Sequence, residues 1–286
     1  MTAPRRRPEP DPSPGSEPGP EPRPDTRPHP YLSRPPVPRV LAHRGLVTAD
    51  LAADGVLENT AAAMDAAVAA GARYLESDVR LSRDGVVVLA HDADLRRTLG
   101  DPRRIDALTA RELSAMFADR GGLLTLADAL ERYPDRHLNL DIKSADVAEP
   151  AGRILGRHPD RVLIASFADP HRQRALAAAR AAHPRGERPA ISLGSDQLLR
   201  VLRRLLLRRT AAAARALAGF DAMQIPERRG PVPVLTPRLI DLAHRAGVEV
   251  HVWTVNDPVR MRRLTAMGVD GIVTDRADLA LATLHP

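Results

Sequence analysis

The sequence predicts an α/β fold, a (β/α)8 barrel of the TIM type, on two observations. Eight short apolar runs alternate with segments of helical spacing, and this alternation is typical of parallel βαβ units. The chain has 286 residues, of which 248 remain once a proline-rich N-terminal segment of 38 residues is set aside. One barrel of this type usually takes about 250 residues, so the remainder is expected to form a single domain.

The apolar runs and the helical spacing locate the expected elements. Strands are predicted at 40–43, 74–79, 137–142, 162–166, 190–193, 221–225, 248–254 and 271–274. Helices are predicted, among others, at 60–70, 126–132, 170–182, 197–218, 237–246 and 258–267. The pairs Asn59-Thr60 and Thr236-Pro237 are typical of a helix start, and Gly247 is typical of a helix end.

One segment interrupts the alternation of strands and helices. Asp84 and Gly85 separate the second strand from the apolar run 86–91, and Asp-Gly between apolar runs is a hairpin signal. We therefore expect 86–91 to run antiparallel to the second strand. We expect an insertion from about 81 to 122 over the barrel mouth. It should contain a helix at 109–117, because Thr109 and Glu112 have capping-box spacing.

The N-terminal segment 1–38 differs sharply in composition from the rest. It holds 14 of the 27 prolines and very few apolar residues. Such a segment cannot offset its ordering entropy by burying apolar surface, which predicts a disordered tail that favours the polyproline II conformation. The barrel is then expected to span 39–286, and removal of 1–38 should leave its function intact.

Composition excludes several classes of protein. The absence of cysteine excludes disulfides, thiolate zinc sites and a cysteine nucleophile. The arginines at 5–7 have no apolar region after them, and no stretch of 18 uncharged apolar residues occurs, so we expect neither a standard secretory signal nor a transmembrane segment, and a cytoplasmic location. Seven aromatic residues are too few for a base-stacking surface, which argues against nucleic acid as a partner.

The basic residues raise two further points. The formal charge is +6, and it is spread over many Arg–Asp/Glu neighbours, which favours a solvated basic surface over a polyanion site. The basic amphipathic stretch 198–209 allows peripheral contact with an anionic membrane, although such a helix more often packs on the outside of a barrel. Of 42 basic residues only one is lysine, Lys143, which suggests a site that needs a compact charge.

Polar residues gather at the C-terminal ends of the predicted strands, where barrel enzymes have their active sites. The first strand ends at His43, followed by Arg44. Glu76 and Asp78 of the second strand are two residues apart and project to the same face. Two carboxylates in a dry interior need a cation, either a divalent metal with oxygen ligands or a paired arginine.

Two more segments add groups to the same end of the barrel. The third strand places Asn139, Asp141 and Lys143 on one face, so Asp141 offers a third carboxylate and Lys143 suits a phosphate oxygen. The hairpin strand ends at His91 and Asp92. Two histidines can divide general acid and general base roles, and a divalent ion can polarise a phosphoryl oxygen. These are the parts needed to split a phosphodiester.

The sequence resembles the glycerophosphodiester phosphodiesterase family of the PI-PLC-like superfamily. The matching segments lie in order and cover nearly all of 39–280. They are Ala42-His43-Arg44-Gly45, Glu58-Asn59-Thr60, Glu76-Ser77-Asp78-Val79, Asp84-Gly85-Val86, the segment from His91-Asp92 to Thr98, Leu140-Asp141-Ile142-Lys143, Trp253-Thr254-Val255-Asn256 and the segment from Gly268 to Asp275. The family is a TIM barrel with a small insertion after the second strand.

The resemblance implies a role for each matching residue. His43 and His91 match the catalytic histidines, Arg44 and Lys143 match phosphate-binding residues, and Trp253 matches an aromatic residue of the pocket wall. The metal ligands, usually for Ca²⁺ or Mg²⁺, match Glu76 and Asp78, with Glu58 at the edge of the site. The family usually has Glu where this chain has Asp141, which would alter ligation. The loop 46–57 is longer than usual, which would reshape the pocket beside His43.

These matches imply a metal-dependent enzyme that hydrolyses glycerophosphodiesters to sn-glycerol 3-phosphate and an alcohol. The nucleophile, the metal, the head group and the oligomeric state stay open. A lysophospholipase D acting on lysophospholipids is the nearest alternative, and a non-catalytic barrel that binds a phosphorylated ligand is a second. The small-molecule diester is the expected partner, and a nucleic-acid partner rests only on the charge of +6.

Overall fold

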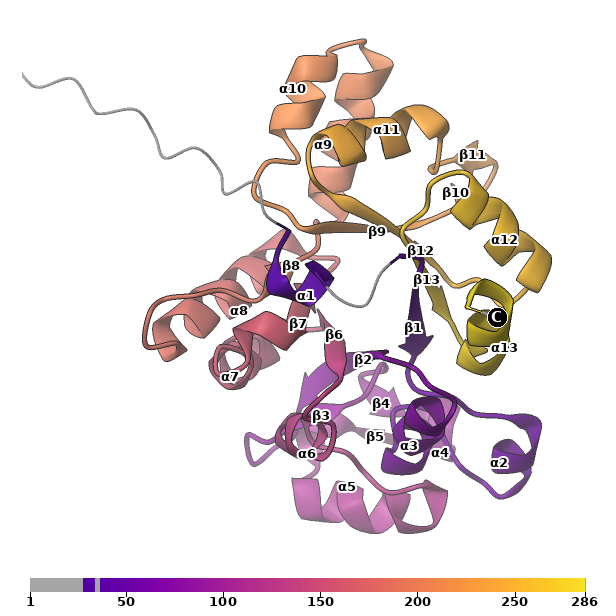
Figure 1. Ribbon diagram of the computed structural model, residues 1–286. Coiled ribbons are helices and arrows are strands. Elements are labelled where there is room, and N and C mark those ends of the chain that lie inside the picture. Colours follow the sequence, from indigo (N-terminus) through magenta and orange to yellow (C-terminus); the bar gives the residue numbers. More distant parts are fainter. Residues whose placement is uncertain (1–27, 34–36, 286) are drawn as a thin grey trace, which may run out of the picture.

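The computed structural model describes residues 28–33 and 37–285, and Figure 1 shows a ring of strands surrounded by helices. Parallel strands form the ring in the order β8-β7-β6-β2-β1-β13-β12-β9. A short bridge between Ser192 and Ala222 joins β8 to β9. The strands are β1 (Arg39–His43), β2 (Tyr74–Leu81), β6 (His137–Ile142), β7 (Val162–Ala165), β8 (Ala190–Ile191), β9 (Ala222–Pro226), β12 (Glu249–Trp253) and β13 (Gly271–Thr274). The predicted TIM barrel is confirmed.

Helices cover the outside of this ring, and buried aliphatic side chains fill the space between the two layers. The helices are α1 (Pro30–Ser33), α2 (Ala49–Ala53), α3 (Ala61–Ala69), α4 (Arg96–Leu99), α5 (Ala110–Phe117), α6 (Leu126–Arg132), α7 (Ala145–Leu155), α8 (Asp169–Ala182), α9 (Ser195–Leu206), α10 (Thr210–Arg215), α11 (Pro237–Arg245), α12 (Pro258–Ala266) and α13 (Ala277–Leu284). Short 3₁₀ turns are η1 (Ile105–Ala107), η2 (Ala118–Arg120) and η3 (Pro159–Arg161).

Most predicted helices match the structure, with two differences. The expected helix at 197–218 is two helices, α9 and α10, because Arg208 between them takes a left-handed φ of 57°. Asn59 does not cap α3: its own φ is 61°, and the side chain of Thr60 accepts the hydrogen bond from the N–H of Ala63. Thr236 caps α11 in the predicted way, by accepting from the N–H of Leu239.

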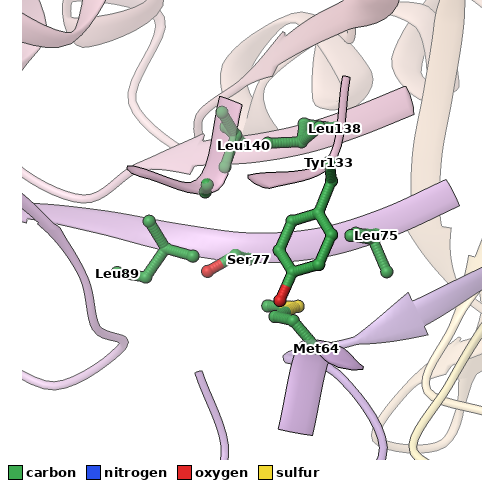
Figure 2. Close-up of a pocket in the computed structure, with 8 residues that line it drawn as sticks. Met64, Leu75, Ser77, Leu89, Tyr133, Leu138 and Leu140 are labelled. Carbon is green, nitrogen blue, oxygen red and sulfur yellow. The ribbon is translucent and has the colours of Figure 1, made fainter. Parts of the chain in front are cut away.

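Figure 2 shows the face of β2 and β6 that packs against Tyr133 and against Met64 of the outer helix α3. Leu75 and Ser77 of β2 lie with Leu138 and Leu140 of β6 around a small space of about 10 Å³. Because neighbouring residues on a strand alternate between faces, the residues between them point into the barrel. They are Glu76, Asp78, Asn139 and Asp141. The alternation thus places the acidic side chains inside the ring.

The insertion after β2 has the predicted hairpin and the predicted helix. β3 (Val87–Leu89) pairs antiparallel with β2. β4 (Asp94–Leu95) and β5 (Asp101–Arg104) form a second hairpin. Thr109 and Glu112 form both bonds of a capping box at the start of α5. In Figure 1 these elements lie beside β2 rather than across the axis of the ring, so the insertion forms a side wall of the mouth rather than a cover.

The boundary at residue 38 is wrong as a limit of the folded domain. Most of the predicted tail, 1–27 and 34–36, lies outside the described residues. Residues 30–33, however, form α1, where Tyr31 is 0% and Leu32 5% exposed. The Tyr31 ring packs edge-on against Tyr74 at the start of β2 and against His137 at the start of β6. The high proline content of this segment hid the fact that it contains two side chains that become buried. The helix α1 lies at the end of the barrel opposite the C-termini of the strands (Figure 1).

Tyr31→Ala should lower the free energy of unfolding by about 3 kcal/mol, because it empties a fully buried aromatic position. For a domain of this size, this corresponds to a fall in Tm of roughly 6–12 °C. Thermal unfolding of the full chain, of Tyr31→Ala and of a chain starting at residue 39 checks this. The last two should both be destabilised. A chain starting at residue 39 that melts like the full chain would contradict the assignment of α1 to the domain.

Charged and titratable groups also lie at this end of the barrel. Arg39 donates to Glu249 over 2.8 and 2.7 Å and to the hydroxyl of Tyr74 over 2.8 Å. Burial would raise the pKa of Glu249, but the hydrogen bonds and charges of Arg39 and His251 together outweigh it and lower this pKa to about 2. His137 is different: burial, together with the charge of Arg39, lowers its pKa to about 4, and its Nδ1 has no hydrogen-bond partner.

The His137 pKa predicts a loss of stability in mild acid. Its folded pKa of about 4 is below the ordinary 6.5, so the unfolded chain takes up the proton first. The stabilising contribution is present above pH 6.5 and is lost as the pH falls through about 4. Urea unfolding at pH 7 and pH 5 should show a smaller acid-induced loss for His137→Phe than for the parent chain. Equal losses in the two proteins would refute this account.

Candidate active site

The turn after β1 presents His43 and Arg44 at the barrel mouth. Arg44 has a left-handed φ of 58°, and Gly45 follows with a φ of 91°. A Cβ on Gly45 would lie 2.7 Å from the carbonyl carbon of Ala63, so no other residue fits there without moving α3. The backbone N–H of Arg44 donates to the side chain of Glu76 over 3.2 Å. The tight turn therefore fixes both side chains against β2.

His43 is held from two sides. Its Nδ1 lies 2.6 Å from Oδ1 of Asp275, the residue after β13, and its Nε2 lies 3.9 Å from Oε2 of Glu76. Asp275 itself accepts from the amide of Asn256 over 2.7 Å. Burial alone would lower the pKa of His43, but the Asp275 hydrogen bond and the Glu76 charge outweigh it and raise this pKa. Because Asp275 occupies Nδ1, the other ring nitrogen, Nε2, is the one that faces Glu76.

His91 enters the same cavity from the insertion. Its Nδ1 lies 2.7 Å from Oδ1 of Asp92, and its backbone carbonyl accepts from Arg80 over 2.9 Å. Asp92 also accepts from Arg97 over 2.6 Å. Each histidine therefore has its Nδ1 on a carboxylate and its Nε2 available to another group, which is the arrangement required of a proton donor or acceptor.

The inward carboxylates come from neighbouring strands in register. Asp78 of β2 pairs across the ladder with Asp141 of β6, and Glu76 pairs with Asn139. Burial, with the charge of Asp78, raises the pKa of Glu76 to about 8. Burial also raises the pKa of Asp141, although the Lys143 charge opposes it. Burial and the neighbouring carboxylates both disfavour the ionised forms of these acids, so a cation among them would favour their ionisation.

Lys143 lies between two of these carboxylates. Its Nζ is 2.8 Å from Oδ1 of Asp78 and 2.7 Å from Oδ2 of Asp141, and it lies 5.4 Å from the ring centroid of Phe167. Burial alone would lower the pKa of Lys143, but the two carboxylates outweigh it and raise this pKa. The only lysine of the chain is therefore charged and faces the cavity.

Glu58 does not line the cavity. Its Oε1 accepts from Arg44 over 2.8 Å and from Arg97 over 2.6 Å. Burial would raise the pKa of Glu58, but these two arginines lower it. The Glu58 carboxylate therefore holds the Arg44 side chain in position from outside the cavity. Its contacts with two guanidinium groups do not support the prediction that Glu58 ligates a metal.

Three inward residues of β2 and β6 carry oxygens that suit a divalent cation. Among the described residues, no three acidic or histidine side chains converge closely enough to enclose an ion as they stand. Buried oxygens that accept no hydrogen bond nevertheless remain, namely Asn139 Oδ1, Asp141 Oδ1 and Asp78 Oδ2, the last of which lies 3.2 Å from Nε of Arg44. Hard cations such as Ca²⁺ and Mg²⁺ prefer carboxylate and amide oxygens of this kind. Such an ion would also counter the burial that raises the pKa values of Glu76 and Asp141.

The two histidines, the inward acids, Arg44 and Lys143 open onto one cavity of about 850 Å³. The aromatic wall is formed by Trp253 at the end of β12 and by Phe167 after β7, whose ring centroids are 5.8 Å apart. The predicted site residues that the cavity brings together are His43, Arg44, Glu76, Asp78, His91, Asp141, Lys143 and Trp253. The long loop 46–57 forms α2 and contributes no residue to the cavity wall, so it does not reshape the pocket.

Sequence reasoning missed three residues that shape this site. Asp275 and Asn256 lie in matched segments, but nothing in their spacing indicates a hydrogen bond to His43, which is 232 residues from Asp275. Phe167 was not considered, although its position directly after the predicted strand 162–166 is a usable signal.

The family follows from comparison with known proteins. The model of the Glycerophosphoryl diester phosphodiesterase family matches residues 43–279, which is most of the chain. The chain belongs to this family. It is therefore an enzyme, a phosphodiesterase on a TIM barrel.

Individual relatives agree with this membership. Probable glycerophosphodiester phosphodiesterase 2 of Mycobacterium tuberculosis is 39% identical over 242 residues, covering 84% of this chain and 88% of the relative. The crystal structure of glycerophosphodiester phosphodiesterase from Thermotoga maritima aligns with a TM-score of 0.62 at 26% identity, covering 85% of this chain and 96% of that one. A lysophospholipase D of Mus musculus matches only in part, with 32% identity over 37% of this chain and 34% of its own.

In the part of the chain that the structure describes, no helix is both long and apolar enough to cross a bilayer.

Proposed function

We propose that this enzyme hydrolyses glycerophosphodiesters to sn-glycerol 3-phosphate and an alcohol, with a divalent metal ion and two histidines. The observation that carries the proposal is the cavity that brings His43 and His91 together with three buried acids and Lys143. The names of the relatives supply the substrate class, and the geometry supplies residues suited to each task.

The charged residues bind and orient the phosphodiester in this proposal. Lys143 and Arg44 face the cavity and neutralise negative charge on the phosphoryl oxygens as it builds up. Glu76, Asp78 and Asp141, with Asn139 beside them, would hold the metal, which would polarise a phosphoryl oxygen when bound. Glu58 keeps the guanidinium of Arg44 in place, and Phe167 and Trp253 form the aromatic wall on one side.

The two histidines divide the proton transfers. The Nδ1–H of His43 donates to Asp275, and that of His91 donates to Asp92, so both Nε2 atoms are available for exchange. One Nε2 accepts a proton from the attacking oxygen, and the other donates a proton to the leaving alcohol. A separate carboxylate orients each ring. A change in the protonation state of one histidine therefore does not disturb the orientation of the other.

Removal of metal should lower activity at least about a hundredfold, because Glu76, Asp78 and Asp141 would be left to repel the substrate phosphate. A coupled assay of glycerol 3-phosphate release measures this with glycerophosphocholine and glycerophosphoethanolamine, before and after exhaustive chelation. Added Ca²⁺ or Mg²⁺ should restore turnover. Elemental analysis of the chelated enzyme serves as the control. Full activity in a preparation shown to be free of metal would reject the metal part of the proposal.

A further inference from the structure

The active-site cavity extends beyond the polar residues into an apolar groove. This groove lies between α9 and the hairpin of β10 (Arg228–Arg229) and β11 (Val232–Pro233), which are both in the upper part of Figure 1. We call it the α9 groove. Its apolar side chains are Leu193, Leu198, Leu199, Leu202, Val232 and Val234. Leu199 and Val232 are 62% and 60% exposed. Exposed apolar surface that is gathered at a cavity often marks a binding site.

The apolar side of α9 packs against the barrel core and also reaches the cavity. Val201 and Leu205 are buried in the core between the helices and the ring, and Leu198 and Leu202 are partly buried against the same core. Leu198 and Leu202 also line the cavity, as does Leu199. The role of an outer barrel helix accounts for the packed residues, but it leaves the exposed Leu199 at the cavity unexplained.

The size of the cavity exceeds what a small glycerophosphodiester needs. Cavities of about 300–1,000 Å³ normally enclose drug-sized ligands, and this one measures about 850 Å³. The phosphate-facing groups, which include His43, His91 and Lys143, come from β1, the insertion and β6. The opposite side, from β8 to β11, offers mainly hydrocarbon, which gains nothing from contact with a polar head group.

The charge at the rim of the groove further defines its occupant. Arg228 and Arg229 both line the cavity. Within the described residues, neither forms an ion pair with a carboxylate. A cationic head group such as choline would be repelled at this end. A hydrocarbon chain can pack against the leucines of the groove, and because it carries no charge the arginines do not repel it.

We propose that the α9 groove binds the acyl chain of a monoacyl glycerophosphodiester, a lysophospholipid, which makes this substrate class the preferred one. The inference rests on the proposed function. An oxygen of water forms a bond to phosphorus, the bond from phosphorus to the head-group oxygen breaks, and that oxygen takes up a proton. The products are monoacylglycerol 3-phosphate and the head-group alcohol, and no further reactant is needed.

The first test compares the metal-loaded full chain on glycerophosphocholine and on lysophosphatidylcholines of increasing acyl length, each below its critical micelle concentration. Choline release measures both substrates equally. The kcat/KM should rise with chain length, by up to about fourfold for each methylene removed from water. A flat or falling series, with activity on the deacylated diester intact, overturns the groove. No activity on any diester instead overturns the proposed function.

The second test places a charge in the groove. Leu199→Glu should lower kcat/KM for the longest acyl substrate at least about tenfold relative to its effect on glycerophosphocholine, because a carboxylate would have to be desolvated beside the chain. Leu206→Glu is the matched control, since Leu206 is on the same helix, 83% exposed, and outside the cavity. Equal specificity ratios in the two variants would overturn the proposal. Because both side chains are exposed, thermal unfolding should remain unchanged.

Discussion

His43→Ala and His91→Ala should each lower kcat on glycerophosphodiesters by at least about a hundredfold, since general acid–base catalysis commonly contributes 10²–10⁴. Each ring has its Nδ1 on a carboxylate, with distances of 2.6 Å to Asp275 and 2.7 Å to Asp92. The remaining Nε2 of each ring is the atom that exchanges a proton with substrate. Alanine removes this atom.

Steady-state kinetics with saturating metal measure this effect, and His171→Ala is the matched control. His171 is a partly buried histidine on α8 that does not line the cavity. The KM should change less than kcat, because the charged groups that bind phosphate are untouched. If one of the two alanine variants turns over substrate nearly as fast as the parent enzyme, the histidine replaced in that variant does not transfer a catalytic proton.

The two histidines also differ in how firmly the fold holds them. His43 is the last residue of β1, a strand of the ring, and its partner Asp275 is fixed by Asn256. His91 belongs to the insertion and depends on Asp92, which Arg97 connects to Glu58. Through Arg44, the same Glu58 contacts the turn after β1. Ion pairs therefore connect the insertion to the barrel at the point where the two histidines must face one substrate.

The inner face of β2 and β6 was predictable from the sequence because a strand alternates its side chains. The two-residue spacing of Glu76 and Asp78 sufficed for their orientation, and the register then places Asp141 beside Asp78. The Asp84-Gly85 turn similarly predicted that His91 returns to the mouth, which it does through β3. In each case a local rule determined where a polar side chain points.

The features that sequence reasoning missed depend on long-range packing. No local pattern pairs His43 with Asp275, because their approach depends on the closing of the ring between β1 and β13. The burial of Tyr31 was hidden by its proline-rich surroundings, although its ring packs against β2 and β6. For Glu58, a motif gives the identity of the residue but not its contacts with Arg44 and Arg97.

Lys143→Met should lower kcat/KM by about 10²–10³, the usual effect of removing one preorganised group that stabilises charge in the transition state. Methionine keeps an unbranched apolar stem of nearly the same length and removes the charged ammonium. Asp78 and Asp141 would then lose the ammonium that lies 2.8 and 2.7 Å from them. Breaking a buried ion pair in this way costs about 3–5 kcal/mol of stability.

These two effects respond differently to metal, which makes the prediction specific. A divalent ion neutralises the same carboxylates, so added Ca²⁺ or Mg²⁺ should recover most of the lost Tm but little of the lost kcat/KM. Thermal unfolding and steady-state kinetics on one preparation measure both. Full recovery of activity by metal would mean that Lys143 only balances the charge of the acids and does not act on the phosphate.

Lys143→Arg tests why a chain with 41 arginines keeps one lysine here. The ammonium lies between two carboxylates and beside the Phe167 ring, a space that suits a compact charge. The larger planar guanidinium would displace one of these neighbours, so arginine should restore less than about a tenth of the parent kcat/KM. Arg153→Lys, at an exposed pair with Glu149, should change neither activity nor stability. An arginine variant with parent activity would show that position 143 needs only a positive charge.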